Sequence, residues 1–329
     1  MLVSVIRQIF RRGRSIDERL AEWTSEPFYD EALLASRMRK KSEALRDDGY
    51  LRYPALVHVE TQAVCNAACT FCPYPRLDRK GTRMPDSLID KILSDLADIP
   101  KELPFQFAPY KVSDPFVEAR LFDILRTANE RIPNANISLF TNGAALTDSN
   151  ISKLREVRKV SYVNVSLNFC DPQEYQAVMG IPFDRTIKRL AALHEAKAAG
   201  ELDFPVRITR VSGDRESDRA FLAWTRAHYP AFDVVIIPRN DWIGEIAPGP
   251  SMPQVPDAPC HRWFDLSITA TGKVAMCCMD GEAQYPKGDV REQHALEIYN
   301  QPFLLELRTQ LLSRKSVRAP CNRCTYMSY

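Results

Sequence analysis

The chain has 329 residues, enough for one large domain or two ordinary ones. Its 44 basic and 42 acidic residues leave a formal charge of only +2, which gives no support for a nucleic-acid-binding surface. No apolar run reaches the roughly 20 residues that a membrane-spanning helix needs, and no cleavage site follows the first residues. We therefore predict a soluble, cytoplasmic protein.

Residues 1–52 are rich in Arg, Lys and Glu, with apolar residues at roughly helical intervals. We predict an N-terminal helical extension here. Residues 1–14 carry four arginines beside apolar side chains, a pattern that would also suit contact with an anionic membrane surface. A helix packed on the domain, or a frayed terminus, is the interpretation we favour.

Residues 53–240 alternate short β-rich runs with helical patterns. The predicted strands are Ala55–Thr61, Pro104–Ala108, Ile137–Asn142, Tyr162–Asn168, Val206–Val211 and Asp233–Pro238. The predicted helices are Ser87–Ile99, Val117–Glu130, Ile151–Val157, Phe183–Ala199 and Arg219–His228. Strands joined by crossover helices form a parallel sheet, and six repeats are fewer than the eight of a closed barrel. We predict an α/β fold, a partial (β/α)6 TIM-like barrel with its site at the carboxyl ends of the strands.

A second module is predicted at residues 241–329. Residues 241–259 contain five prolines and two glycines, which is typical of a loop or linker, and five of the nine cysteines follow. Ser267–Thr271 and Lys273–Met276 flank Gly272 with the alternation of a β-hairpin. We predict a small α+β domain that binds a metal centre.

The first predicted strand is followed by three closely spaced cysteines, Cys65, Cys69 and Cys72, in the pattern C-x3-C-x2-C. A [4Fe–4S] cluster is normally held by four thiolates, so three local ligands leave one iron open to another group. Structural zinc, the alternative, prefers two close pairs of ligands and a closed shell. The triplet therefore favours a reactive iron–sulfur cluster.

This triplet, with an aromatic residue just before its last cysteine, resembles the signature of the radical S-adenosylmethionine (SAM) enzymes. The resemblance implies that SAM chelates the open iron and is cleaved to a 5′-deoxyadenosyl radical that abstracts a substrate hydrogen. It also implies that Cys65, Cys69 and Cys72 hold the cluster and that Phe71 lies against the adenine, although core packing would also explain Phe71. A flavodoxin- or ferredoxin-type electron donor is the expected partner.

The remaining cofactor contacts follow from the same resemblance. The family places Gly-Gly-Glu-Pro after its second strand, whereas here Ser113 and Asp114 precede Pro115, a departure that keeps an acid before the proline. Residues at later strand ends bind the ribose and carboxylate in similar enzymes. The corresponding residues here are Asn142, Ser166, Asn168 and Arg210, whose alternative roles are strand-end hydrogen bonds or a salt bridge.

The C-terminal cysteines resemble the auxiliary-cluster module called twitch, a shortened SPASM domain. The pattern C…G-x4-C…C-x2-C is made by Cys260, Cys277, Cys321 and Cys324, which would close one second [4Fe–4S] cluster. Zinc remains the alternative, because four cysteines also satisfy it. Cys278 would point away from the cluster, since neighbouring strand residues face opposite sides.

The resemblance extends to the twitch-containing dehydrogenase of aminocyclitol antibiotic biosynthesis. It implies oxidation of a carbinol of a sugar or aminocyclitol, with the auxiliary cluster accepting an electron. The candidate substrate or catalytic residues are Tyr110, Lys111, Arg210, Arg239, Asp241, His261 and Cys170. Asp241 or His261 would serve as a base more easily than Arg239.

Three alternatives to this reaction stay open. A radical epimerase would use a thiol such as Cys170 or Cys278 as hydrogen donor, although Cys170 would also suit a small buried position. Peptide-modifying relatives often rely on a leader-binding domain, for which residues 1–52 look too short and too helical, although a separate partner could supply it. A non-catalytic iron–sulfur protein would leave the three-cysteine triplet without a purpose.

Overall fold

A computed structural model of the chain describes residues 31–247 and 254–327. Residues 1–14, for which membrane contact is the alternative to a packed helix or a frayed terminus, lie outside these residues. No helix of the described ranges is both long and apolar enough to cross a membrane.

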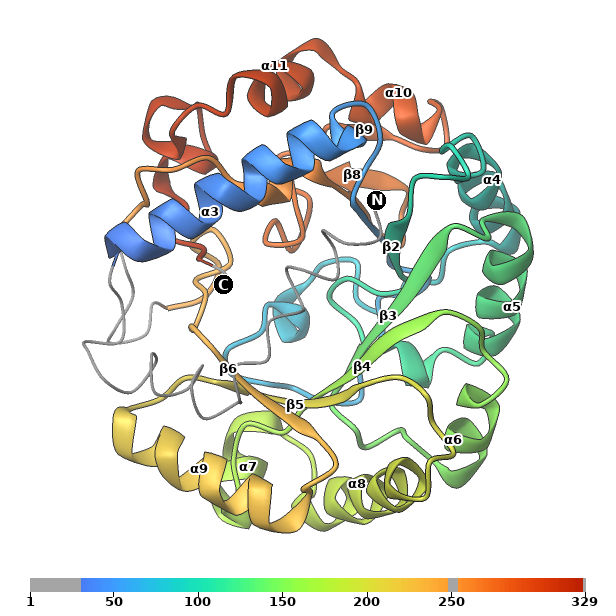
Figure 1. The fold of residues 1–329 in the computed structure, drawn as a ribbon, viewed down its shortest axis with the longest axis vertical. Coiled ribbons are helices and arrows are strands. Elements are labelled where there is room, and N and C mark those ends of the chain that lie inside the picture. The colour runs from blue at the N-terminus through green and yellow to red at the C-terminus, as the bar shows by residue number, and fades with distance from the viewer. Residues whose placement is uncertain (1–30, 248–253, 328–329) are drawn as a thin grey trace.

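One curved sheet of nine strands runs through the described chain in the order β6-β5-β4-β3-β2-β1-β7-β8-β9 (Figure 1). The first six strands are parallel and follow the predicted β/α order: β1 (Leu56–Val59), β2 (Phe105–Ala108), β3 (Ala135–Thr141), β4 (Val160–Ser166), β5 (Val206–Val211) and β6 (Asp233–Ile237). The fold is therefore the predicted α/β partial barrel.

The predicted hairpin extends this sheet rather than standing apart from it. β7 (Asp265–Ile268) pairs in parallel with β1, placing Ser267 opposite His58. β8 (Lys273–Ala275) and β9 (Gly288–Asp289) then continue antiparallel. The C-terminal cysteine module is thus hydrogen-bonded directly to the strand that precedes the first cysteine triplet.

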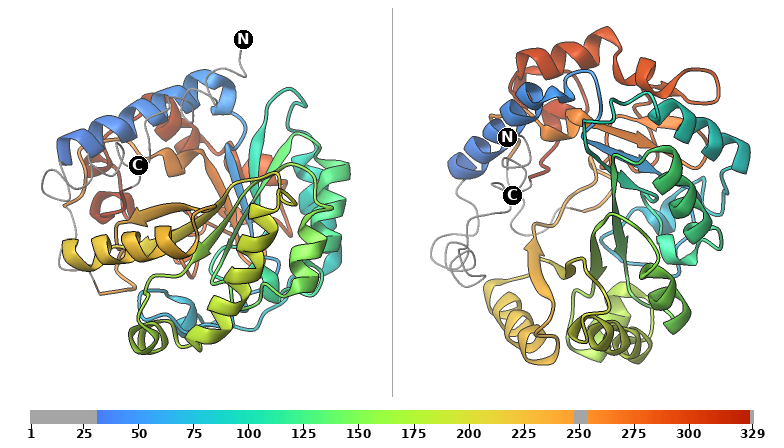
Figure 2. Two further views of the ribbon diagram at one scale, coloured as in Figure 1. Left: turned by 60° about the horizontal axis from the view of Figure 1, so that its bottom comes forward. Right: turned by 45° about the vertical axis from the view of Figure 1, so that its right-hand side comes forward.

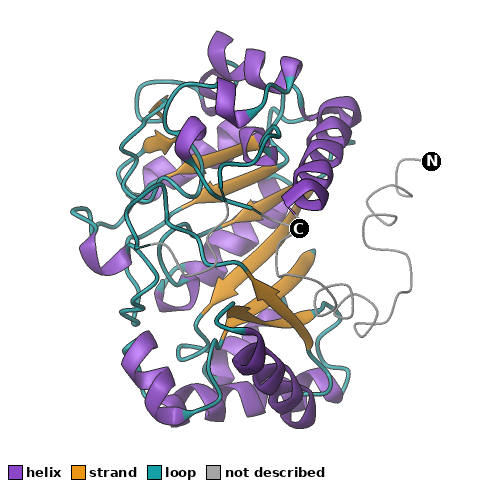
Figure 3. Cartoon of the chain, turned by 90° about the vertical axis from the view of Figure 1, so that its left-hand side faces the viewer, coloured by secondary structure: helices purple, strands orange, loops and turns teal. Residues whose placement is uncertain are grey.

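Helices cover the convex side of the sheet (Figures 1 and 3). They are α4 (Asp86–Leu96), α5 (Leu121–Arg131), α6 (Asp148–Leu154), α7 (Pro172–Met179), α8 (Phe183–Ala198) and α9 (Arg215–His228). Val57 and Val59 of β1 are buried in the core between sheet and helices. Because side chains alternate along a strand, His58 lies on the opposite, concave face.

Local signals account for most differences from the predicted helices. α5 begins at Leu121 rather than Val117 because a 3-10 turn, Pro115–Val117, comes first. α7 was not predicted, although Asp171 caps its N-terminus and Gly180 ends it at φ +69°. The helix is only eight residues long, and such short helices carry a weak periodic signal.

A second buried cluster lies between the C-terminal module and helix α3 (Glu31–Leu45). Leu34 and Met38 of α3 pack with Trp263 and Phe264 and with helix α11 (Pro302–Gln310), which lies beside α3 (Figure 2). Helix α10 (Ala295–Tyr299) instead belongs to the main core and packs on α4. Arg308 of α11 is fully buried and donates hydrogen bonds to three backbone carbonyls. The α3 segment therefore forms part of the wall around the C-terminal cysteines.

Candidate functional site

The three cysteines of the triplet lie on one loop at the carboxyl end of β1 and are half-buried. Backbone N–H groups of Ala67 and Tyr74 donate to Cys65 Sγ and Cys72 Sγ, both at 3.5 Å. Burial raises the pKa of the Cys65 thiol to about 12 and that of Cys72 to about 11. N–H donors aimed at sulfur are a feature of iron–sulfur ligands, whose potentials they tune.

The C-terminal end of helix α7 binds this loop through backbone hydrogen bonds. Ala68 N donates to Met179 O and Thr70 N to Val178 O, both at 3.0 Å. A Cβ added at Gly180 would lie 3.1 Å from Ala68 Cβ, and its φ of +69° already disfavours a side chain. Gly180 is therefore needed both to end α7 and to let the cysteine loop approach.

Asp114 organises the loop after β2. It is 2% exposed and accepts hydrogen bonds from Phe116 N, Thr141 Oγ1 and Asn142 N. Asn142 then donates from Nδ2 to Cys65 Sγ at 3.7 Å and to Asn66 Oδ1 at 2.7 Å. Asp114 thus positions the loops around the triplet, while half-buried Ser113 beside it remains a predicted cofactor contact.

The strand-end residues predicted to bind the cofactor also lie together. Asn168, at φ +67°, donates to Ser166 Oγ at 2.8 Å and accepts from Val211 N. Arg210 forms a buried ion pair with Asp218 at 2.6 Å and also donates to Asn168 O and to Ser217 Oγ. A cofactor carboxylate at Arg210 would have to share these contacts.

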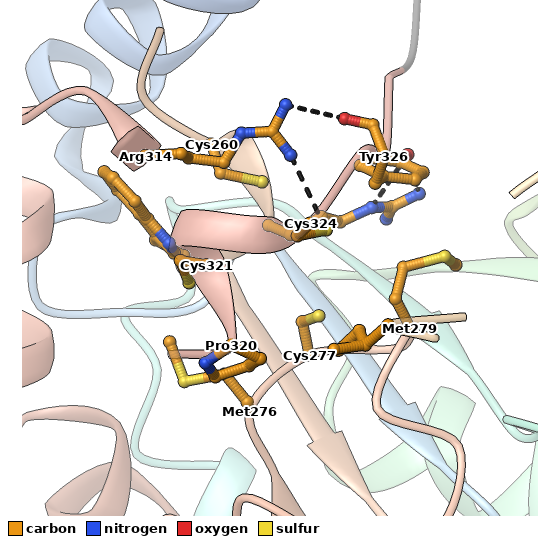
Figure 4. A pocket seen from close by; sticks show the side chains of 12 residues that line it. Cys260, Met276, Cys277, Met279, Arg314, Pro320, Cys321, Cys324 and Tyr326 are labelled. Carbon is orange, nitrogen blue, oxygen red and sulfur yellow. Dashed lines mark hydrogen bonds between the residues drawn. The ribbon is translucent and has the colours of Figure 1, made fainter. Parts of the chain in front are cut away.

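The other four predicted cluster cysteines converge on one pocket, although they come from widely separated segments (Figure 4). They are Cys260, Cys277, Cys321 and Cys324. Arg314 also lines this pocket and donates to Cys324 Sγ at 3.7 Å and to Tyr326 O at 2.7 Å. A buried cation beside four thiols suits a negatively charged cluster.

The spacing of the sulfur atoms bears on the zinc alternative. Ligand atoms on one tetrahedral zinc ion lie roughly 3.3–3.8 Å apart, given its bond lengths. Within residues 31–247 and 254–327, the one group of three His, Cys, Asp or Glu ligand atoms within 4.8 Å of one another is His58, Asp265 and Cys278. No three sulfur atoms of either cysteine set therefore lie within 4.8 Å of one another, a wider spacing than one tetrahedral zinc ion needs.

The two residues after β2 that were predicted to face substrate take different positions. The Lys111 ammonium is buried and donates to the carbonyls of Asp280 and Gly281, at 2.6 and 3.0 Å. Burial lowers the pKa of Lys111. Tyr110 packs edge-on against His58 and near Phe140 on the concave side of the sheet. Lys111 therefore ties the β2 loop to the loop after Cys277.

The candidate bases are separated by the fold. Half-buried Asp241 begins a turn and accepts from Ile243 N; in the same turn Trp242 Nε1 donates to Phe71 O at 3.1 Å, so this turn lies against the cysteine loop. His261 is 3% exposed and lies beside the Tyr326 ring, and burial lowers its pKa well below the usual value.

Arg239 and Cys170 are half-buried positions beyond the ends of β6 and β4, respectively. Their roles stay predictions, as do those of the other candidate substrate residues.

Two features of the site were missed in the sequence. The first is a buried ion pair in which Arg79 Nε lies 2.7 Å from Glu60 Oε2. Glu60 also accepts from Val112 N and Ala270 N, so four segments meet at one carboxylate. The second is the group of His58, Asp265 and Cys278. Neither has a local signal, because their members come from different elements.

The family models match this arrangement. Residues 59–222 match the model of the radical SAM superfamily, and residues 260–325 match that of the iron–sulfur cluster-binding SPASM domain. The chain belongs to the radical SAM superfamily and carries a C-terminal SPASM-type domain. It is a radical SAM enzyme with a SAM-binding [4Fe–4S] cluster and an auxiliary iron–sulfur cluster.

Solved structures share this fold at low identity. BtrN in complex with AdoMet and 2-DOIA is 15% identical, with a TM-score of 0.56 over 83% of this chain and 98% of that chain. Streptococcus suis SuiB bound to precursor peptide SuiA is 14% identical, with a TM-score of 0.63 over 87% and 73%. Native anSMEcpe with AdoMet and the Cp18Cys peptide is 14% identical, with a TM-score of 0.56 over 82% and 85%. No curated protein matches the sequence significantly.

Proposed function

We propose that this enzyme oxidises a carbinol of a sugar or aminocyclitol-type substrate to a ketone. The observation that carries the proposal is the pocket that gathers Cys260, Cys277, Cys321 and Cys324. Four thiolates close the coordination of one cluster, which suits an electron acceptor rather than a substrate-binding metal. BtrN, whose structure holds AdoMet and the small molecule 2-DOIA, is covered over 98% of its chain, which agrees with this substrate class.

The bound groups supply a 5′-deoxyadenosyl radical, which takes one hydrogen atom, and an acceptor for the one electron left after the hydroxyl proton departs. The chain must supply the base for that proton. We assign this role to Asp241, because its turn contacts Phe71 of the cysteine loop and its carboxylate is half-buried rather than enclosed. His261 is buried, at 3% exposure, and is the weaker candidate.

The same cysteine loop is held at Cys65 by Asn142 and at Cys69 by Met179, through contacts of 3.7 and 3.6 Å to sulfur. We assign Cys65, Cys69 and Cys72 to the SAM-binding cluster. Ser113, Asn142, Ser166 and Asn168 are the proposed contacts of the SAM polar groups, and Phe71 of its adenine.

The test uses anaerobically reconstituted protein with SAM and dithionite, screened against aminocyclitols and sugars deuterated at the carbinol carbon. We expect about eight irons per chain for two cubane clusters, deuterated 5′-deoxyadenosine and a ketone product. Cys65→Ala/Cys69→Ala/Cys72→Ala should abolish SAM cleavage but keep the auxiliary cluster. Asp241→Asn should lose ketone formation by about 100-fold or more while SAM cleavage persists.

Other products would overturn the assignment. An epimer carrying solvent hydrogen would make the reaction redox-neutral, with a thiol such as Cys170 or Cys278 as donor. Turnover of a peptide with no reaction of any carbinol would move the enzyme to peptide modification, as the peptide-bound SuiB and anSMEcpe structures illustrate for those proteins.

A further inference from the structure

Three buried side chains of different chemistry meet on the concave side of the sheet. His58 comes from β1, Asp265 from β7 and Cys278 from the loop after β8. One ligand atom from each lies within 4.8 Å of the others. All three residues are buried, at 8%, 3% and 8% exposure. No role in holding either cluster accounts for them.

His58 has the hydrogen-bonding pattern of a metal ligand. Its Nδ1 lies 3.3 Å from the carbonyl oxygen of Tyr110, which requires a proton on Nδ1 and leaves a lone pair on Nε2. Within the described part of the chain, buried Nε2 has no hydrogen-bond partner. Metal-bound imidazoles almost always donate their other ring N–H to a carbonyl or carboxylate in this way.

Asp265 has a comparable outer contact. Arg262 donates to its Oδ2 at 2.9 Å, which leaves the second carboxylate oxygen as a ligand. The Arg262 guanidinium also donates to Tyr326 Oη, at 2.8 and 3.1 Å. Three further cations face the group: Lys111, which is bound to two carbonyls, and Lys41 and Lys287, which lie on the Asp265 side. A thiolate and a carboxylate together supply two negative charges, which match a divalent ion.

We propose that His58, Asp265 and Cys278 bind one divalent cation of the zinc class, separate from both iron–sulfur clusters. Nitrogen, oxygen and sulfur ligands in one set are those that zinc and similar borderline ions accept. Closing the ligand spacing to that of a tetrahedral ion requires movements of about 1 Å. Three protein ligands leave the fourth position open, which is the arrangement of catalytic rather than structural zinc.

The open position would take a further oxygen ligand. Its fourth ligand would be water or an oxygen atom of the substrate, such as a hydroxyl or carboxylate group. Cys278 immediately follows Cys277, so a substrate held here would lie beside the proposed auxiliary cluster. The metal-binding step itself does not depend on the identity of the reaction.

The experiment titrates Co2+ into cluster-loaded protein without SAM or substrate, at equal iron and sulfide content in every variant. Co2+ replaces zinc and reports thiolate ligation as a charge-transfer band. We expect one equivalent with this band for the wild-type chain. His58→Ala, Asp265→Asn and Cys278→Ser should each lose that equivalent or weaken its binding by at least 10-fold.

Cys170→Ala is the matched control for metal content, because it removes a cysteine outside the site and should keep the equivalent. Asp265→Asn retains a side chain that can accept from Arg262, so it guards against a folding defect. The same cobalt content in all variants, or an equivalent bound without the thiolate band, would overturn the proposal. Failure of carbinol oxidation would leave this result unchanged, since no turnover is measured.

Discussion

The buried Glu60–Arg79 pair makes the sharpest prediction about stability. Its side chains are 0% and 5% exposed, and Glu60 Oε1 and Oε2 receive Arg79 Nη2 and Nε at 2.9 and 2.7 Å. Arg79→Met removes the cation and leaves the carboxylate buried. Breaking such a pair from one side costs about 3–5 kcal/mol.

Two contacts place the expected value at the low end of that range. Glu60 keeps the backbone donors Val112 N at 3.1 Å and Ala270 N at 3.0 Å, which continue to stabilise its charge. We therefore expect Arg79→Met to lower the free energy of unfolding by about 3 kcal/mol. Adding Glu60→Gln removes the charge but keeps one acceptor oxygen for these two N–H donors, so the double variant should recover only about 1 kcal/mol.

The measurement is urea unfolding of anaerobic, cluster-loaded protein, followed by far-UV circular dichroism. Arg126→Met is the control, because Arg126 pairs with Asp123 in an exposed ion pair and its loss should change stability little. A loss below 1 kcal/mol for Arg79→Met, or a double variant no more stable than the single one, would refute the argument for a buried charge.

Tyr50 donates its hydroxyl to Pro104 O, and burial raises its pKa to about 12. Because the pKa of Tyr50 is higher in the folded than in the unfolded chain, where it is near 10, its contribution to the free energy of unfolding is complete below pH 10 and is lost as the pH rises to 12. In unfolding measured as a function of pH, Tyr50→Phe should therefore reduce the loss of stability between pH 10 and 12. Gly180→Ala and Gly200→Ala each introduce backbone strain of roughly 1–2 kcal/mol, because both glycines have positive φ. Only the new Cβ at position 180 would contact the cysteine loop, so iron analysis should show a loss of iron from the first cluster in Gly180→Ala and not in Gly200→Ala. Arg314→Met should make the reduction potential of the auxiliary cluster more negative in an EPR titration, because it removes a buried cation; exposed Lys315→Met should not, and equal shifts would contradict this reasoning.

Local patterns in the sequence were sufficient for the class of fold and the family. The spacing of Cys65, Cys69 and Cys72 predicts an open cluster because all three ligands lie within one short loop. Alternation and helical periodicity likewise predict the order of β1 to β6, because the buried positions of each strand are apolar in its own sequence. The ends of elements were less accurate, and α7 was missed because it is short.

Only the tertiary structure decided which distant residues meet. Cys260 and Cys324 share a pocket although 63 residues separate them in the sequence. Strand β7 likewise pairs with β1, although most of the sequence lies between the two strands. The Glu60–Arg79 pair and the group of His58, Asp265 and Cys278 likewise join separate segments. Each of these residues is ordinary in its local context, and its role arises from neighbours that strand pairing brings close. The sequence by itself therefore determined the chemistry of the first cluster, whereas the tertiary structure decided the surroundings in which a substrate would bind.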